Sequence, residues 1–224
     1  HGVIIKADGS KVTVNIGEAE GDPVFCVTDL LPHLATEQMK RPSVGLIRGE
    51  ELNVLVGSMP FKKSEESEAV KLNLLHILYE KYGITESDFV SAELEAVPAF
   101  PVKEIGFDRS MILGYGHDDR VCAYPSMLAQ INVTNVERTS ITLIVDKEEI
   151  GSVGATGMTS RFFENTVAEI MTLAGEGSPL ALRRALARSR MLSSDVSAGF
   201  DPAYASVFEA KNSAYLGRGL VFNK

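Results

Sequence analysis

The sequence predicts a β-rich unit over residues 1–112 followed by an α/β unit over residues 113–224. Three observations lead to this fold class. Two β-branched runs flank the turn dipeptide Asp8-Gly9, which is typical of a hairpin. The segment 138–146, which has an apolar run at four of the five positions from 141 to 145, is typical of a strand buried on both faces of a parallel sheet. Helical patterns follow that run in the last third of the chain.

The β-rich unit opens with the hairpin VIIKADGSKVTVNI and continues to a short strand within ELNVLVGSMP. Residues 62–83 form the clearest predicted helix, because apolar residues recur at helical spacing and Gly83 supplies a stop. The charge run at its start is predicted to be a solvated helix beginning. Residues 88–112 contain two prolines and are predicted to be extended.

The α/β unit is predicted to contain the strand at 138–146 and two helices after it. The first helix has Thr159 or Ser160 as its N-cap, and the second has Ser178 as cap with Pro179 in its first turn. The segment MLSSDVSAGF, residues 191–200, is predicted to be a short strand with its exit loop.

Composition excludes several classes of protein. The net charge of -8 argues against a duplex nucleic-acid partner, which favours a basic face. Cys26 and Cys122 are the only cysteines, too few for a disulfide scaffold, and they fit a reducing, cytoplasmic location. No apolar run approaches the roughly 18 residues of a membrane span, so we expect no membrane partner. The first residues lack a starting Met and do not resemble a signal peptide, which suggests a piece of a longer chain.

Acidic residues stand where the predicted strands of the α/β unit end. Glu148 and Glu149 follow the apolar run, and Asp195 follows the short strand. Asp118 and Asp119 lie in a glycine-rich turn that opens a helix. Open α/β sheets carry their chemistry beyond the carboxyl ends of their strands, and converging carboxylates remain ionised together when a cation holds them. Oxygen ligands of this kind fit Zn²⁺, Mn²⁺, Co²⁺ or Mg²⁺.

Two adjacent glutamates suit a division of roles, in which one binds a metal and its neighbour takes a proton from the water that the metal activates. Taken singly, each acidic site has an ordinary structural explanation: a solvated turn, an Asp–Arg pair or a turn cap. The combination of three acidic sites in one α/β unit favours a metal centre.

Three stretches, GYGHDDRVCAY, DKEEIGSVGATGMTSRFFEN and MLSSDVSAGFDPAY, resemble in order and spacing the aspartyl aminopeptidase and vacuolar aminopeptidase I family of dinuclear zinc exopeptidases. KNSAYLGRGL and GEELNVLVGSMP add to the resemblance. It implies a zinc-exopeptidase-like α/β catalytic domain, partial in this chain, interrupted by a β-rich dimerisation domain. It also implies peptide substrates and dimers that assemble into a dodecamer.

By position, the resemblance makes Asp118 the aspartate that bridges two zinc ions, with Co²⁺ or Mn²⁺ as possible substitutes. It makes Glu148 the general base, Glu149 a ligand of one metal and Asp195 a ligand of the other. The family's two histidine ligands fall outside the region that these residues cover. We therefore expect an internal fragment that binds zinc weakly on its own and leaves apolar surface uncovered around 140–145.

The remaining histidines do not supply the missing ligands by position. Asp29, rather than His33, occupies the place of a family histidine that reaches a neighbouring subunit, and His117 stands beside Asp118 without an implied role. Three hypotheses stay open: a metal-dependent aminopeptidase, an inactive assembly fragment of one, and a metal-free glycosidase that uses paired carboxylates. The residues of the motif GHDDRVCAY favour substrates with neutral rather than acidic N-terminal residues.

Overall fold

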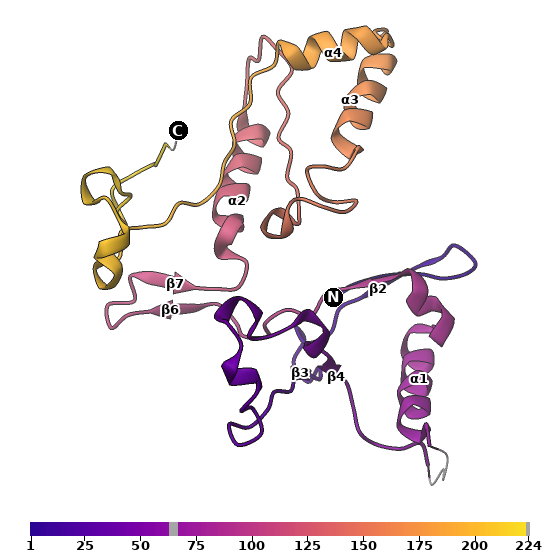
Figure 1. Ribbon diagram of the computed structural model, residues 1–224. Coiled ribbons are helices and arrows are strands. Elements are labelled where there is room, and N and C mark those ends of the chain that lie inside the picture. The colour runs from indigo at the N-terminus through magenta and orange to yellow at the C-terminus, as the bar shows by residue number, and fades with distance from the viewer. Residues whose placement is uncertain (63–66, 223–224) are drawn as a thin grey trace. The chain divides into compact units, whose positions relative to one another are not determined.

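The computed structural model describes residues 1–62 and 67–222, which form two compact units, His1–Pro101 and Val102–Lys224 (Figure 1). The division falls before the expected change at 112 and 113, because the hairpin of β6 (Lys103–Ile105) and β7 (Met111–Leu113) belongs to the second unit. Among the described residues, no helix is both long and apolar enough to cross a bilayer.

The first unit is built on an antiparallel sheet of three strands in the order β2-β1-β5. β1 (Gly2–Ile5) and β2 (Lys11–Val14) form the predicted hairpin, and β5 (Ala92–Leu94) pairs with the other edge of β1. Asp8 fixes the turn, because its carboxylate accepts hydrogen bonds from the Ser10 amide at 2.8 Å and the Ser10 hydroxyl at 2.6 Å. The hairpin prediction is confirmed.

One helix, α1 (Ala69–Tyr82), packs against this sheet near its C-terminus and ends as predicted at Gly83, whose φ of 63° is in the left-handed region. Part of the charge run predicted to open the helix, residues 63–66, lies outside the described residues. The core of the unit is small: Ile4, Val14 and Ile84 are buried together, and Leu78 and Tyr82 of the helix are among the residues packed against them.

A long irregular segment separates the hairpin from α1. Its regular pairing is a ladder between β3 (Cys26–Val27) and β4 (Val54–Leu55), so the short strand expected in this stretch is present. Three 3₁₀ turns lie between the two strands: η1 (Gln38–Lys40), η2 (Ser43–Gly45) and η3 (Gly49–Glu51). A further 3₁₀ element, η4 (Glu86–Ser91), precedes β5.

The second unit continues from its hairpin into α2 (His117–Asn132), which opens in the predicted glycine-rich turn. α3 (Phe162–Leu173) begins later than expected, with Arg161 rather than Thr159 or Ser160 as its N-cap. α4 (Pro179–Ala187) has its predicted cap, since the Ser178 hydroxyl accepts a hydrogen bond from the Leu180 amide at 3.3 Å. Three 3₁₀ turns complete the unit: η5 (Glu148–Ile150), η6 (Pro202–Val207) and η7 (Ala210–Asn212).

Two predicted strands are absent from the described part of the second unit. Residues 138–146 have no ladder partner, and residues 191–200 contribute a single bridge, between Gly199 and Ala214. The prediction was wrong for a physical reason: a strand exists through hydrogen bonds to neighbours, and among the described residues no strand lies beside 138–146 and a single bridge pairs with 191–200. The expected uncovered apolar surface is present, because Ile141 and Ile144 are more than half exposed.

The chain as a whole leaves much of its surface open, with an accessible area of 19027 Å². Even two separate compact units of half its mass would together expose only about 12,000 Å². Side chains normally found in cores are therefore in contact with solvent, such as Leu173 at 89% and Val44 at 99% exposure. Many apolar side chains of these 224 residues therefore lie outside a buried core.

Candidate metal centre

The beginning of α2 is shaped by Gly116, whose φ of 71° is left-handed. A Cβ at this position would lie 2.0 Å from an Arg120 guanidinium nitrogen, so a side chain would displace that arginine. The Arg120 guanidinium in turn donates a hydrogen bond to the Tyr115 carbonyl at 3.3 Å. The glycine and the arginine thus hold the turn that presents the two aspartates.

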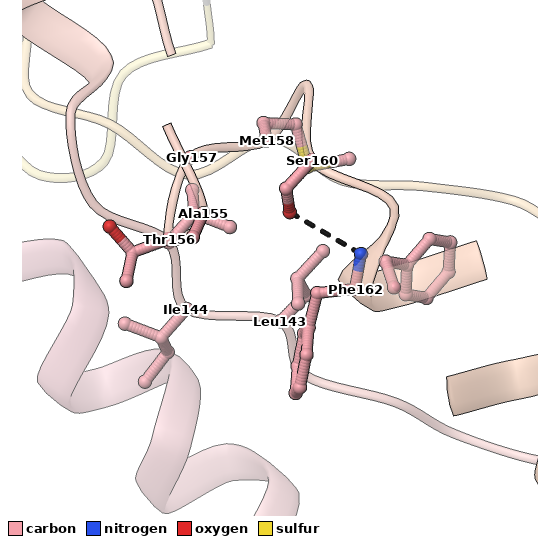
Figure 2. Close-up of a pocket in the computed structure, with 10 residues that line it drawn as sticks. Leu143, Ile144, Ala155, Thr156, Gly157, Met158, Ser160 and Phe162 are labelled. Atoms are coloured by element: carbon pink, nitrogen blue, oxygen red, sulfur yellow. Dashed lines mark hydrogen bonds between the residues drawn. The ribbon is translucent and has the colours of Figure 1, made fainter. Parts of the chain in front are cut away.

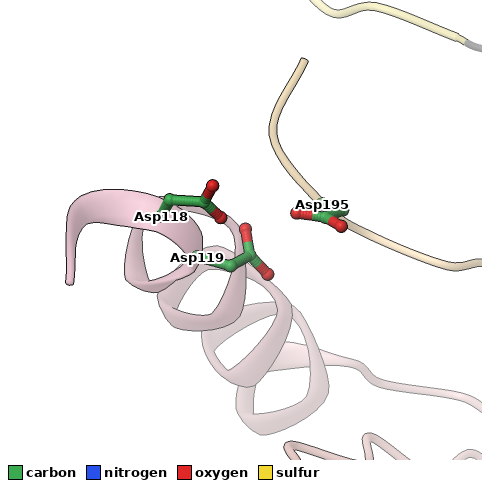
Figure 3. Close-up of side chains that lie close together, drawn as sticks. All are labelled: Asp118, Asp119 and Asp195. Atoms are coloured by element: carbon green, nitrogen blue, oxygen red, sulfur yellow. The ribbon is translucent and has the colours of Figure 1, made fainter. Parts of the chain in front are cut away.

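Asp118 and Asp119 depart from helical geometry within the first turn of α2, and the peptide bond between them is cis. Asp195 comes from the irregular segment after α4, where its carboxylate accepts a hydrogen bond from the Val196 amide at 2.7 Å. Figure 3 shows the three carboxylates pointing toward one another, and one oxygen of each lies within 4.8 Å of the others. We call these three residues the aspartate group. The structure therefore brings together two predicted ligands, Asp118 and Asp195, from segments far apart in the chain.

The surroundings of the aspartate group fit a cation. The Oδ1 atom of Asp119 is buried and has no hydrogen-bond partner, which is costly for a carboxylate oxygen unless an opposite charge faces it. Hydrogen bonding to the Asp119 carboxylate raises the pKa of the Cys122 thiol, and burial adds to that shift. Carboxylate oxygens are ligands that both Mn²⁺ and Zn²⁺ accept.

Glu148 and Glu149 lie in η5, between two left-handed residues, Lys147 with φ of 67° and Gly151 with φ of 94°. Hydrogen bonds from the Gly151 amide to the Glu148 carbonyl at 2.9 Å and from the Ser152 amide to the Lys147 carbonyl at 2.7 Å close the turn. Both glutamate side chains are exposed. Neither belongs to the aspartate group, so their roles as base and ligand stay predictions.

The glycine-rich loop after the glutamates folds back on itself. The Thr159 hydroxyl donates to the Ser152 carbonyl at 2.7 Å, and the Asp146 amide donates to the Thr156 carbonyl at 3.0 Å. A Cβ on Gly157 would lie 2.1 Å from the Ser152 carbonyl oxygen, so the loop closes only with glycine there. This closure fixes the backbone that carries the two glutamates.

A small apolar pocket of about 190 Å³ adjoins this loop (Figure 2). Leu143 and Ile144 line it from the apolar run, and Met158 and Phe162 line it from the far side of the loop. The Phe162 amide donates a hydrogen bond to the Ser160 hydroxyl at 3.4 Å beside the pocket. The pocket contains no ionisable side chain and is therefore distinct from the aspartate group.

The histidines of the chain do not complete the candidate centre. His117 precedes Asp118 but is not part of the aspartate group, and His33 is exposed in the first unit. His76 makes an edge-on contact with Phe61, with ring centroids 5.2 Å apart. Asp119, which the sequence analysis placed in the acidic turn without a ligand role, is the third member of the aspartate group.

Comparison with known proteins identifies the family. The family model described as "Aminopeptidase I zinc metalloprotease (M18)" matches residues 1–224. A probable M18 family aminopeptidase 1 of Clostridium acetobutylicum is 59% identical over 224 residues, covering 100% of this chain and 48% of that protein. Its counterpart in Thermotoga maritima is 43% identical over 225 residues, covering 100% of this chain and 49% of that protein.

Solved structures agree with this assignment. An M18 family aminopeptidase from Thermotoga maritima superposes with a TM-score of 0.81 at 42% identity, over 98% of this chain and 48% of that one. Aminopeptidase I from Clostridium acetobutylicum gives a TM-score of 0.80 at 57% identity, over 98% and 47% of the two chains. The chain spans about half the length of the curated relatives it matches. With the whole chain matched by the family model, the protein belongs to the aminopeptidase I zinc metalloprotease (M18) family.

Proposed function

We propose that the protein is a metal-dependent aminopeptidase that hydrolyses N-terminal residues from peptides. The observation that carries the proposal is the convergence of Asp118, Asp119 and Asp195, with a buried carboxylate oxygen that has no partner of its own. Family membership supplies the reaction class and the metal, zinc. Neutral rather than acidic N-terminal residues are the proposed substrates.

The residues that would hold the metal are Asp118, Glu149 and Asp195, with Asp118 shared between two zinc ions. When bound, zinc polarises the scissile carbonyl and makes water more acidic. Glu148 takes a proton from the attacking water and passes it to the nitrogen of the leaving amine. Glu148 is exposed in a 3₁₀ turn that two backbone hydrogen bonds close, which supports this role, because a base has to reach its substrate.

The test is Glu148→Gln, which keeps the shape of the side chain and removes its basicity. We expect turnover of an aminoacyl chromogenic substrate to fall by roughly 10²–10⁴-fold with zinc content unchanged. Glu176→Gln, an exposed glutamate before α4, is the matched control and should retain full activity. More than about a tenth of the activity in the Glu148 variant would remove the residue from the role of base.

In the second candidate function, the chain takes part in an oligomeric assembly and has no peptidase activity of its own. This function is favoured by the absence of any histidine from the aspartate group within the described residues. Assay of these 224 residues beside the gene's complete product separates the two candidates. Activity in both supports the enzyme, and activity in the complete product alone supports the assembly function.

We further propose homo-oligomers in which the first unit makes the dimer contacts and dimers assemble to a dodecamer. The exposed apolar side chains between β3 and β4, such as Leu31 at 64% and Leu34 at 70% exposure, support a protein contact there. A cytoplasmic location is proposed from the two cysteines, both free thiols.

A further inference from the structure

α4 and the segments beside it carry an unusual concentration of positive charge. Between Glu176 and Asp195 the sequence contains four arginines and no acidic residue. A fifth arginine reaches them from elsewhere, since the Arg138 guanidinium donates to the Arg188 carbonyl at 3.2 Å. We call the five residues the arginine cluster: Arg138, Arg183, Arg184, Arg188 and Arg190. All five are exposed, in a chain whose net charge is -8.

Helix electrostatics explain only part of this cluster. The Arg188 side chain donates to the Arg184 carbonyl at 3.2 Å, so it caps the last turn of α4 and faces the negative end of the helix dipole. Arg183 and Arg190 make no such contact. No ion pair involves any of the five among the residues that the structure describes, although Glu137 is next to Arg138 in the sequence. Arginines four apart on a helix repel one another, so an opposing negative surface would stabilise the cluster.

The first unit has an excess of negative charge. Residues 1–101 contain sixteen acidic residues against nine Lys and Arg. Within it, the loop at residues 17–22, which we call the acidic loop, holds three carboxylates. Asp22 braces the loop, because it accepts hydrogen bonds from the Gly17 amide at 3.0 Å and the Ala19 amide at 3.2 Å. Glu18 and Glu20 are exposed on it.

We propose that the arginine cluster of one chain docks on the acidic loop of a second copy of the chain. The inference extends the proposed self-association and does not depend on peptidase activity. Charge complementarity selects this occupant: guanidinium groups bind carboxylates with directed hydrogen bonds, and the acidic chain as a whole would repel a nucleic acid. Contacts of this kind are sensitive to salt and control which partner is bound.

The experiment measures the molar mass of the gene's complete product by light scattering at about 50 mM and about 500 mM salt, where the Debye length falls from about 14 Å to about 4 Å. Arg183→Glu together with Arg190→Glu should weaken self-association by about tenfold or more at the lower salt. Lys211→Glu together with Arg218→Glu makes the same change of charge elsewhere in the second unit and should leave the mass unchanged.

A charge swap completes the test. Glu18→Lys together with Glu20→Lys should weaken self-association to a similar extent, and mixing this variant with the double arginine variant should restore the parental mass. An unchanged mass in the arginine variant would overturn the proposal, and so would a loss that the mixture fails to restore. Loss of the parental association on nuclease treatment would assign the cluster to a nucleic acid instead. Activity, recorded in parallel, tests the proposed function separately.

Discussion

Replacement of Asp195 by Asn should have opposite effects on stability with and without metal. The three carboxylates of the aspartate group approach within 4.8 Å of one another. Two unit charges at that separation repel by about 0.9 kcal/mol in a water-like dielectric and by about 3.5 kcal/mol at an effective dielectric constant of about 20. Asp195→Asn removes two of the three repulsive pairs. Because Asp118 and Asp195 are exposed, the water-like limit applies and salt screens the repulsion further, so we expect the metal-free protein to gain about 1 kcal/mol of stability.

The same substitution removes a ligand. Zinc at about ten times its dissociation constant should stabilise the parent by about 1.4 kcal/mol and the variant by less. Urea unfolding with chelator and with zinc measures both effects on the same samples. The reasoning would be refuted if the chelated variant were less stable than the chelated parent. It would also be refuted if zinc stabilised the two proteins equally.

Three further outcomes are expected. Ser178→Ala should lower the stability of the second unit by about 1 kcal/mol in urea unfolding, because the Leu180 amide loses its cap. Gly157→Ala should reduce peptidase turnover, because its Cβ would displace the Ser152 carbonyl 2.1 Å away, whereas Gly45→Ala, with nothing within 4 Å, should not. The Thr85 amide, which donates to the Asp88 carboxylate at 2.7 Å, is the main cause of an Asp88 pKa below its ordinary value of 3.8. The ionised Asp88 carboxylate therefore contributes fully to stability above about pH 4, and this contribution is lost as the pH falls through the lower pKa of the folded state. The acid-induced drop in the unfolding midpoint should accordingly be smaller in Asp88→Asn.

The sequence predicted those elements whose signals are local. The Asp8-Gly9 turn, the Gly83 stop and the Ser178 cap each depend on residues a few positions apart, and each is present. Local hydrogen bonds of this kind form whatever the rest of the chain does. The family resemblance assigned Asp118 and Asp195 to one metal site, and the structure brings them together although the strand expected before Asp195 is absent.

Elements that need distant partners could not be predicted in the same way. The segment 138–146 contains the apolar run typical of a central strand, but a strand requires neighbours that these residues do not supply. The relatives that the chain matches are about twice as long, so they contain further chain from which such neighbours could come. The missing strand neighbours also affect Glu149. This residue lies in a loop that follows the unpaired segment 138–146, and it remains outside the aspartate group.

The open surface of the chain has a consequence for how it unfolds. An unfolded chain of 24.2 kDa exposes about 35,000 Å², so folding to 19027 Å² buries about 16,000 Å², or about two-thirds of what two compact units would bury. The denaturant dependence of the unfolding free energy and the heat-capacity change both scale with that area. These 224 residues should therefore melt over a broad range of temperature and of urea concentration. Any contact that covers Ile141, Ile144 and Leu173 would sharpen both transitions as well as raise their midpoints.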